Sequence, residues 1–598
     1  MIEPHPVWGR PIEDYAASYE LDSFLQELVP NATPGTTMLV IPAEPLRFIK
    51  EISKIGEEHN EVQVKSLAKH VNLEKLKVIL EITSVHQSFL FLHNPLLVPG
   101  CIKLMTAMDA MEEQSLFRYE YGYLCFRIIS IILGVFLADK QEECGPDGII
   151  GLMRACPETH PLTTLDRIAA LVSQREFDSA SKATKAEKAA KLVTLIPLQV
   201  ASTLFKLVWV NRKLWFKALS ATYTPGLPAV MLLFWQVWGL VSLNSRDRIH
   251  DPLGVWLYDI LRRCCLVCTT GQEMAVRSMM YDVRKLSGQW WNLGGERWKH
   301  GPLVDTEDSK AIIRAYLRRL KPTNSTGWKV PDMILVYHLI EFVAGFVVPE
   351  AEDLLPCLIG DSIDLFWQSL IDNQFGHEQT VLKLGRMFIY ILKMINNILP
   401  QASDYTKEQL LERIDKSHFI DLLGRTLLMC TPGVPGGAYG HEDDGHPDFM
   451  TCTNEICIHL QDSIPGHMFE PKFSHILDDW IKYYSFLEYR CEMGSSLEKH
   501  RENARHVQGI WKRVLHTLKQ ADHVAVAVGC VPPLCSYARC PFPCDPFGMR
   551  NKCAQCPAGY CSLDCQTRDW TCGSELGPHS RRCEIISRLE SMGIRAKH

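Results

Sequence analysis

The sequence predicts a mainly α-helical protein, with a long helical body followed by a small cysteine-rich module. Two observations support this fold class. Apolar residues recur at three- and four-residue intervals through most of the first 520 residues, whereas period-two alternation is nearly absent. Ten of the 22 cysteines then fall between Cys530 and Cys583, where proline and glycine also become frequent. The helical pattern ends between about residues 520 and 532.

Within the body, six stretches show the helical period most clearly. They are residues 67–83, 121–139, 309–320, 330–348, 380–399 and 473–493. Glycine, proline and polar residues gather at three breaks, residues 141–148, 287–302 and 431–448. A long run of helices joined by short loops is typical of an α-solenoid, here of the Arm-like kind. No fixed-period repeat motif is evident, so an irregular all-α array stays open as the alternative.

The length of 598 residues is too great for one hydrophobic core, so we expect two or more structural units. The predicted division is a helical body over residues 1–525, in one or two lobes, a cysteine-rich module over 530–585 and a terminal helix or tail over 586–598. The first 20 residues lack the basic and apolar regions of a secretory signal. We therefore expect an intracellular protein with reduced thiols, in the nucleus or the cytoplasm.

The longest apolar runs are residues 128–138 and 229–243. Each run is shorter than the roughly 18–20 residues that span a bilayer, so both are predicted to be buried core helices, and no membrane contact is expected. The formal net charge of −6 is small for this length and by itself indicates no partner.

The cysteine-rich module has the composition of a metal site. Clustered cysteines in a reduced protein bind metal more often than they form disulfides. Eight soft ligands form four close pairs: Cys535 and Cys540, Cys553 and Cys556, Cys561 and Cys565, and His579 and Cys583. Because each Zn²⁺ takes four such ligands, eight ligands predict two closed structural zinc sites. Zinc would supply most of the folding free energy of so short a segment.

Spacing alone does not decide which four ligands share an ion. It also leaves alternatives for individual positions. Cys544 could pair with Cys540 in place of Cys535, Cys530 could join the first pair, and Cys572 could compete with His579. Ser562 stands where it could cap a helix that carries Cys565.

The pattern C-x2-C-x4-C-S-x2-C-Q-x2-D-W, followed by H-x3-C, resembles the MYND zinc finger over residues 530–585. The similarity includes non-ligand positions: Tyr560, Ser562, Gln566, Asp569 and Trp570. The resemblance implies two interleaved zinc sites. Cys535, Cys540, Cys561 and Cys565 would hold one ion, and Cys553, Cys556, His579 and Cys583 the other. The helical body, with RYEYGYLCFRI at residues 118–128, resembles that of uncharacterised fungal proteins that end in a MYND finger.

In the MYND family, the residues at the positions of Gln566 and Trp570 line a groove for short proline-rich peptides. The two side chains are one helical turn apart, so both can face outward, although Trp570 could instead only cover the zinc core. Nucleic acid is not expected as a partner. Residues 530–598 contain nine Lys and Arg against six Asp and Glu, and seven ligand thiolates with two Zn²⁺ would bring the charge near zero.

We therefore expect a non-enzymatic adaptor that binds protein partners through its finger and uses the helical body as a scaffold. Closed zinc sites leave no open position for metal-assisted catalysis. A SET-type lysine methyltransferase, an activity found in some MYND proteins, is disfavoured because its cofactor motifs are absent from the sequence. The alternative is an enzyme whose active site lies unrecognised in the helical body. A deep pocket with converging titratable residues would favour that alternative.

Overall fold

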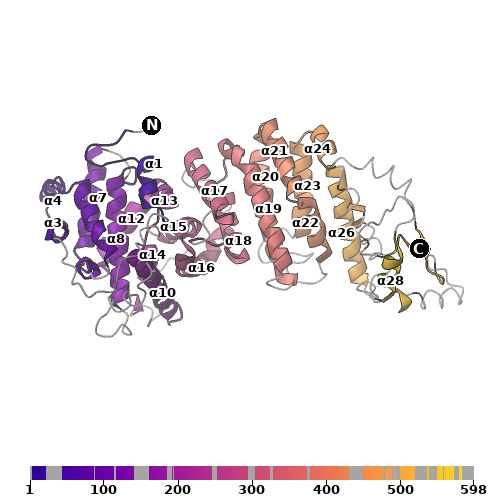
Figure 1. Cartoon of the computed structure of the whole chain (residues 1–598), viewed down its shortest axis with the longest axis horizontal. Helices are drawn as coiled ribbons and strands as arrows, with labels where there is room; N and C mark the ends of the chain where they lie inside the picture. Colours follow the sequence, from indigo (N-terminus) through magenta and orange to yellow (C-terminus); the bar gives the residue numbers. More distant parts are fainter. Residues whose placement is uncertain are drawn as a thin grey trace, which may run out of the picture. The chain divides into compact units, whose positions relative to one another are not determined.

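The computed structural model describes most of the helical body and parts of the cysteine-rich module. The described residues are 3–21, 43–85, 88–112, 116–140, 160–184, 187, 191–192, 194–244, 252–293, 304–322, 327–372, 377–429, 449–473, 476, 480–481, 483–484, 487, 491, 498–518, 535–537, 540, 549–556, 558–571, 578–581 and 583. Among them almost all regular structure is helical, which confirms the predicted mainly α fold class (Figure 1). The chain forms two compact units: Met1–Leu303 with Lys321–Val330, and Val304–Leu320 with Pro331–His598.

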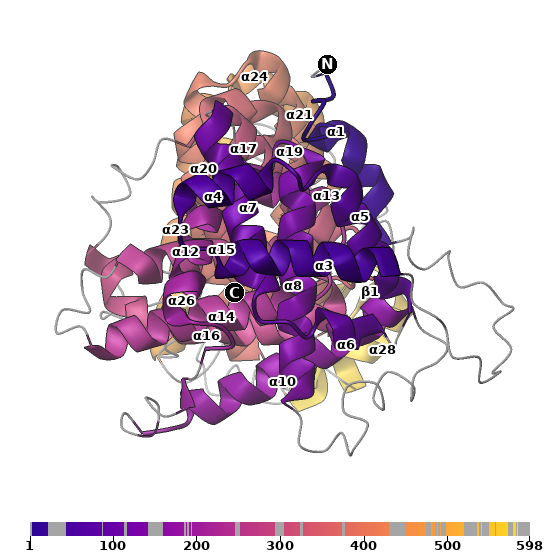
Figure 2. The ribbon, with the colours of Figure 1, turned by 90° about the vertical axis from the view of Figure 1, so that its left-hand side faces the viewer.

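The first unit is built around one fully buried helix. Its described elements are α1 (Ile12–Tyr15), η1 (Ala16–Tyr19), α3 (Ala43–Glu57), α4 (Glu61–Ala68), α5 (Leu73–Glu81), η2 (Ile82–Ser84), α6 (Phe89–Leu92), α7 (Leu97–Glu112), α8 (Glu120–Asp139), α10 (Pro161–Ser181), α12 (Leu198–Val210), α13 (Arg212–Ala221), α14 (Leu227–Asn244), α15 (Pro252–Val267) and α16 (Thr270–Leu293). Helix α8 packs against α5, α7, α10 and α14, and α3 lies against α7 (Figure 2). Every residue of α8 from Glu120 to Ala138 is buried.

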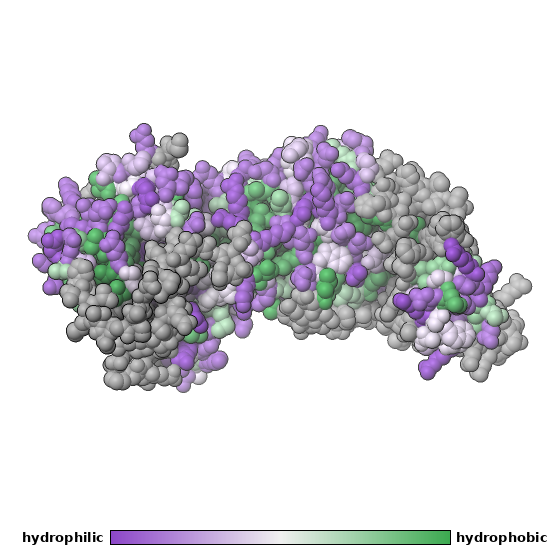
Figure 3. All heavy atoms as spheres, in the orientation of Figure 1, coloured by the Kyte–Doolittle hydropathy of each residue, from purple (hydrophilic) through white to green (hydrophobic). Residues whose placement is uncertain are grey.

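By length and composition alone, two described helical stretches could cross a membrane, Glu120–Asp139 and Pro349–Ile371. The apolar window of the first is 100% buried inside the protein, as expected of a core helix, whereas that of the second is 44% buried. On the face drawn in Figure 3, hydrophilic side chains cover most of the coloured surface, with hydrophobic ones visible between them. This distribution is typical of amphipathic helices that bury one face.

A buried carboxylate holds the turn between α13 and α14. Asp166 on α10 accepts hydrogen bonds from the Gly226 backbone N–H (2.8 Å), Gln272 Nε2 (2.9 Å) and the Tyr223 hydroxyl (3.1 Å). Burial raises the pKa of Asp166 to about 6, and these three hydrogen bonds counteract only part of that effect. Gly226 has φ +78°, and a Cβ there would collide with the carbonyl oxygen of Ser130. The turn therefore requires glycine at this position.

The second unit begins as a stack of helices. Its described elements are α17 (Thr306–Leu320), α18 (Met333–Ala344), η7 (Pro349–Leu354), α19 (Leu355–Asp372), α20 (His377–Ile398), η8 (Leu399–Gln401), α21 (Asp404–Lys416), α22 (Phe419–Met429), α23 (Phe449–Ser463), α24 (Gly466–Phe473), α26 (Glu498–Thr517), β1 (Asn551–Lys552), β2 (Gly559–Tyr560) and α28 (Leu563–Thr571). Helix α19 packs against α17 and α21, while α20 packs against α18 and α23. Each of these helices packs against helices two or three positions away in the chain, and contact limited to near neighbours is the pattern of an α-solenoid.

Four of the six predicted helical stretches correspond to single helices, α8, α17, α18 and α20. The stretch 67–83 is different, because α4 ends at Ala68 and α5 begins at Leu73. Asn72 caps the second helix by accepting a hydrogen bond from the backbone N–H of Lys75, which a continuous helix would not allow (3.1 Å). Most of the stretch 473–493 lies outside the described residues.

One of the three predicted breaks differs from the structure. Helix α16 continues to Leu293, so the first part of the expected loop 287–302 is helical. The strong breaker, Gly294-Gly295, comes only after that helix end. The breaks at 141–148 and 431–448 lie outside the described residues, as do the expected borders near 525, 530 and 586.

Candidate metal centre

A short hairpin and one helix position most of the cysteine ligands. Strands β1 and β2 pair antiparallel, and the Cys553 N–H donates to the Ala558 carbonyl (2.8 Å), which closes the turn that carries Cys553 and Cys556. A second segment is held beside this hairpin, because the Ser536 N–H donates to the Gly559 carbonyl (2.7 Å). The tight turn places the thiols of Cys553 and Cys556 on the same side of the hairpin, in one ligand cluster.

Helix α28 begins as the sequence predicts. The Ser562 hydroxyl accepts a hydrogen bond from the backbone N–H of Cys565 (3.1 Å), so Ser562 is the N-cap. Cys565 and Asp569 are one turn apart and form the buried face of the helix. Gln566 and Trp570, the next pair one turn apart, lie on a more exposed face, and Trp570 is 40% exposed.

The first ligand cluster consists of four buried cysteines. The ligand atoms of Cys535, Cys540, Cys561 and Cys565 all lie within 4.8 Å of one another. Three of the sulfur–sulfur distances are 3.3 Å (Cys540 to Cys561), 3.6 Å (Cys561 to Cys565) and 3.7 Å (Cys540 to Cys565). Tetrahedral zinc, with bonds of about 2.3 Å, requires sulfur–sulfur separations of about 3.8 Å. The donor set and its spacing therefore fit a zinc ion.

The second cluster combines three cysteines with one histidine, Cys553, Cys556, His579 and Cys583. The sulfurs of Cys553 and Cys583 are 3.6 Å apart, and the Cys556 sulfur is 3.5 Å from His579 Nε2. A tetrahedral Zn²⁺ with sulfur and imidazole ligands requires a sulfur–nitrogen separation of about 3.5 Å. Cys553 and Cys556 are partly exposed, whereas His579 and Cys583 are buried. This site is therefore closer to solvent than the first.

The thiols of both clusters have altered acidity. Burial raises the pKa of Cys535 to about 11 and that of Cys583 to about 12. In Cys561 burial acts in the same direction, but hydrogen bonds from neighbouring thiols outweigh it and lower the pKa. Metal binding requires thiolates, so occupation of these clusters must release protons.

The structure brings together the eight residues that the sequence singles out, in the same two groups of four that the resemblance implies. The alternative ligands Cys530, Cys544 and Cys572 lie outside the described residues, as does the terminal segment 586–598.

The sequence did not indicate the role of Asp569. This side chain is 1% exposed, accepts a hydrogen bond from the Tyr560 hydroxyl (2.9 Å) and lies 3.4 Å from His579 Nδ1. Burial, followed by the nearby Asp569 charge, raises the pKa of Tyr560, so its hydroxyl keeps the proton that it donates. The feature of the sequence that could have indicated this role is the position of Asp569 one turn after Cys565, on the ligand-bearing face of α28.

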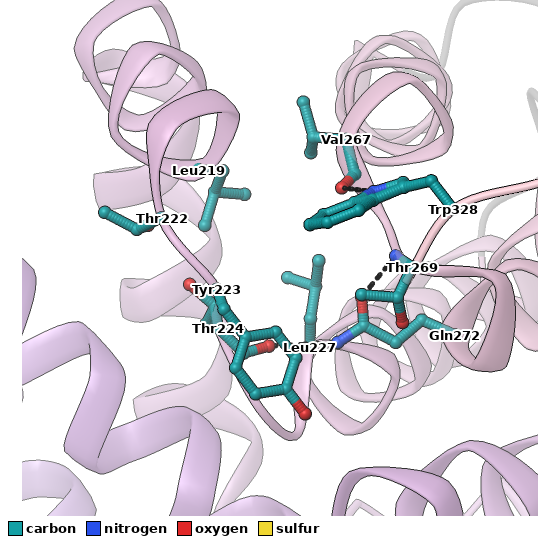
Figure 4. A pocket seen from close by; sticks show the side chains of 9 residues that line it. All are labelled: Leu219, Thr222, Tyr223, Thr224, Leu227, Val267, Thr269, Gln272 and Trp328. Atoms are coloured by element: carbon teal, nitrogen blue, oxygen red, sulfur yellow. Dashed lines mark hydrogen bonds between the residues drawn. The ribbon is translucent and has the colours of Figure 1, made fainter. Parts of the chain in front are cut away.

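A pocket of about 230 Å³, including the open space at its mouth, lies in the first unit (Figure 4). Its lining comes from α13, the turn before α14, the α15–α16 connection and Trp328. The lining residues are Leu219, Thr222, Tyr223, Thr224, Leu227, Val267, Thr269, Gln272 and Trp328. The indole Nε1 of Trp328 donates to the Val267 carbonyl (3.3 Å). The lining residues include no histidine, cysteine, lysine or carboxylate.

The fold and site thus define a class: a mainly α-helical protein with a C-terminal pair of Cys₄ and Cys₃His clusters, each able to hold a metal ion. No protein-family model matches the sequence, and no curated protein matches it.

Proposed function

We propose that this protein is an intracellular, non-enzymatic adaptor whose C-terminal segment is a MYND-type zinc finger. The observation that carries the proposal is the pair of ligand clusters. Each has four soft donors at separations that suit tetrahedral zinc, and neither leaves a ligand position for substrate. Reduced thiols in such clusters are typical of an intracellular environment.

The finger would bind a short proline-rich peptide through Gln566 and Trp570. The Trp570 indole is partly exposed beside the second cluster, with its ring centroid 5.7 Å from that of His579. Gln566 Nε2 donates to the Lys552 carbonyl (3.3 Å), so its amide is held beside the hairpin. Leu563 is 67% exposed and lies one turn before Gln566. It adds a second exposed apolar side chain, beside that of Trp570, to this surface. An indole beside an amide donor and acceptor suits a polyproline II peptide, whose rings stack and whose carbonyls are free.

The helical body would act as the scaffold. In the second unit, helices pack against near neighbours in the chain, as in solenoids, which use their extended surfaces to bind other proteins. The body would hold one partner while the finger recruits another.

The metal part of the proposal is tested by elemental analysis of the full chain, purified under reducing conditions. Two zinc ions per chain are expected, and a value of one or zero would contradict the two-site assignment.

The binding part is tested with an array of proline-containing peptides and fluorescence anisotropy of the best binder. Trp570→Ala should weaken binding at least tenfold while zinc content stays at two. Arg568→Ala is the matched control, since Arg568 lies on the same helix but on the opposite flank, paired with Asp564 (3.0 Å). Equal affinities for wild type and Trp570→Ala would remove Trp570 from the binding surface.

A further inference from the structure

Three segments meet at one buried carboxylate oxygen. Oδ2 of Asp569, on α28, accepts the hydrogen bond from the Tyr560 hydroxyl of β2 at 2.9 Å. The same oxygen lies 3.4 Å from Nδ1 of His579, which belongs to the segment 578–581. The three residues are 1%, 1% and 4% exposed respectively. Water is therefore largely excluded, and each polar contact is stronger than it would be at the surface.

This contact favours one tautomer of the imidazole. An ionised carboxylate only accepts, so the ring nitrogen 3.4 Å from Asp569 Oδ2 is the one placed to donate to it. Nδ1 then donates, and Nε2, 3.5 Å from the Cys556 sulfur, keeps its lone pair for a metal ion. The other tautomer would place a proton between Nε2 and the ion and would leave Asp569 facing a lone pair.

Asp569 itself is not a ligand. The four residues whose ligand atoms converge are Cys553, Cys556, His579 and Cys583, and the carboxylate lies behind the imidazole on its far side from Cys556. Its contribution to the site is made through His579, as with the carboxylates that orient metal-binding histidines in other proteins.

The same imidazole also contacts the exposed tryptophan. The ring centroid of Trp570 lies 5.7 Å from that of His579 at an interplanar angle of 43°, and the Tyr560 ring meets the imidazole edge-on at 6.0 Å. The Ser580 hydroxyl donates to the Trp570 carbonyl (3.2 Å), which joins the histidine segment to the end of α28. The position of the indole thus depends on the position of the histidine.

We propose that Asp569 is the positioning residue of the Cys₃His site, and that through His579 it makes the exposed Trp570 surface depend on the metal ion bound there. This inference rests on the proposed zinc-binding function. The Cys₄ cluster does not include His579, so its ion would be held without the imidazole, although Tyr560 packs against its four cysteines.

The test uses the full chain with Asp569→Asn, which keeps the size of the side chain but removes its charge. Asp564→Asn is the matched control, because Asp564 is an exposed carboxylate near the start of the same helix. Metal affinity is measured by competitive zinc titration with a chromogenic chelator. The two sites are distinguished by ¹¹³Cd NMR, since Cys₄ and Cys₃His environments give separate resonances. Asp569→Asn should weaken one of the two sites 10- to 100-fold and leave the Cys₄ resonance in place.

Three further measurements separate positioning from general support of the fold. In ¹⁵N-histidine-labelled protein, the wild type should show the Nδ1-protonated tautomer at one metal-bound histidine, and Asp569→Asn should lose or broaden that signal. Tyr560→Phe keeps the ring but removes the donor, and should weaken the same site only a few-fold. In a peptide-binding assay at limiting zinc, Asp569→Asn should lose affinity and regain it when zinc is added in excess.

The outcomes are distinct. A wild-type protein that binds fewer than two zinc ions contradicts the proposed function itself. With two ions bound to the wild type, unchanged affinities in Asp569→Asn overturn this inference alone. So do equal losses at both sites, or an equal loss in the Asp564→Asn control.

Discussion

Replacement of Asp166 by asparagine should remove a pH dependence from the stability of the first unit. In the folded protein the pKa of this carboxyl is raised by burial from its ordinary value of 3.8 to about 6. An acid whose pKa is raised on folding stabilises the folded state below its unfolded pKa, and this stabilisation is lost as the pH rises through the folded pKa. The loss therefore falls between about pH 4 and pH 6.

The size of the effect follows from the pKa difference of about two, which corresponds to about 3 kcal/mol. Asparagine has the same shape and is always neutral, so it mimics the protonated acid. Its amide oxygen can still accept from the Gly226 N–H and Gln272, while the Tyr223 hydroxyl can turn to accept from the new N–H₂. The variant should thus gain about 2 kcal/mol over the wild type between pH 4 and pH 7, most of the full difference.

The assay is amide hydrogen exchange of the segment around Gly226, followed by mass spectrometry and corrected for intrinsic exchange rates, at four pH values from 4.5 to 7.5. The ratio of protection in Asp166→Asn to that in the wild type should rise with pH, by about twenty- to thirtyfold over this range. Asp178→Asn, a partly exposed carboxylate on the same helix, is the control and should follow the wild type. A ratio for Asp166→Asn that stays constant with pH would refute the reasoning.

Three further predictions concern single side chains. Gly226→Ala should destabilise the first unit by roughly 2 kcal/mol or more in urea unfolding, because its φ of +78° is unfavourable for alanine and the new methyl group meets the Ser130 carbonyl; an unchanged midpoint would contradict this. Lys103→Met should cost about 1–3 kcal/mol in the same assay, since the ammonium group donates to three carbonyl oxygens at the end of α3; a loss of only a few tenths would mean that solvent replaces these bonds. Cys561→Ser should lower the zinc content and expose the C-terminal segment to protease while the helical circular dichroism stays nearly unchanged. The exposed Cys357→Ser should alter neither property, and a collapse of helicity in Cys561→Ser would mean that the body and the finger do not fold separately.

Where local chemistry decides the structure, the sequence was sufficient to predict it. Helix α8 is apolar on all sides, and a helix of that kind has to be buried. Ser562 caps α28 because its hydroxyl reaches the N–H three residues later, a contact within one turn. The helix predicted over 67–83 was wrong for a related reason: the apolar period continues through Asn72, but the capping bond of that residue breaks the helix.

The buried polar network of the first unit could not be predicted from the sequence. Asp166 is 57 residues from Tyr223 and 106 residues from Gln272, and nothing local to any of them indicates the others. Only the packing of α10 beside α14 and α16 places the carboxylate against those donors and raises its pKa. The same holds for Asp569, whose neighbours Tyr560 and His579 reach it from a strand and from a separate segment.

By itself, then, the sequence determined that the protein is mainly helical and that its cysteines and histidine form closely spaced ligand pairs, because both properties depend on residues a few positions apart. Spacing left open which pairs converge into one cluster, a grouping that only the resemblance implied and that the tertiary structure shows. Only the tertiary structure decided which carboxylate faces His579 and how far Trp570 is exposed. These properties depend on contacts between segments that the chain brings together only by folding, where burial and hydrogen bonds, not spacing, select the partners.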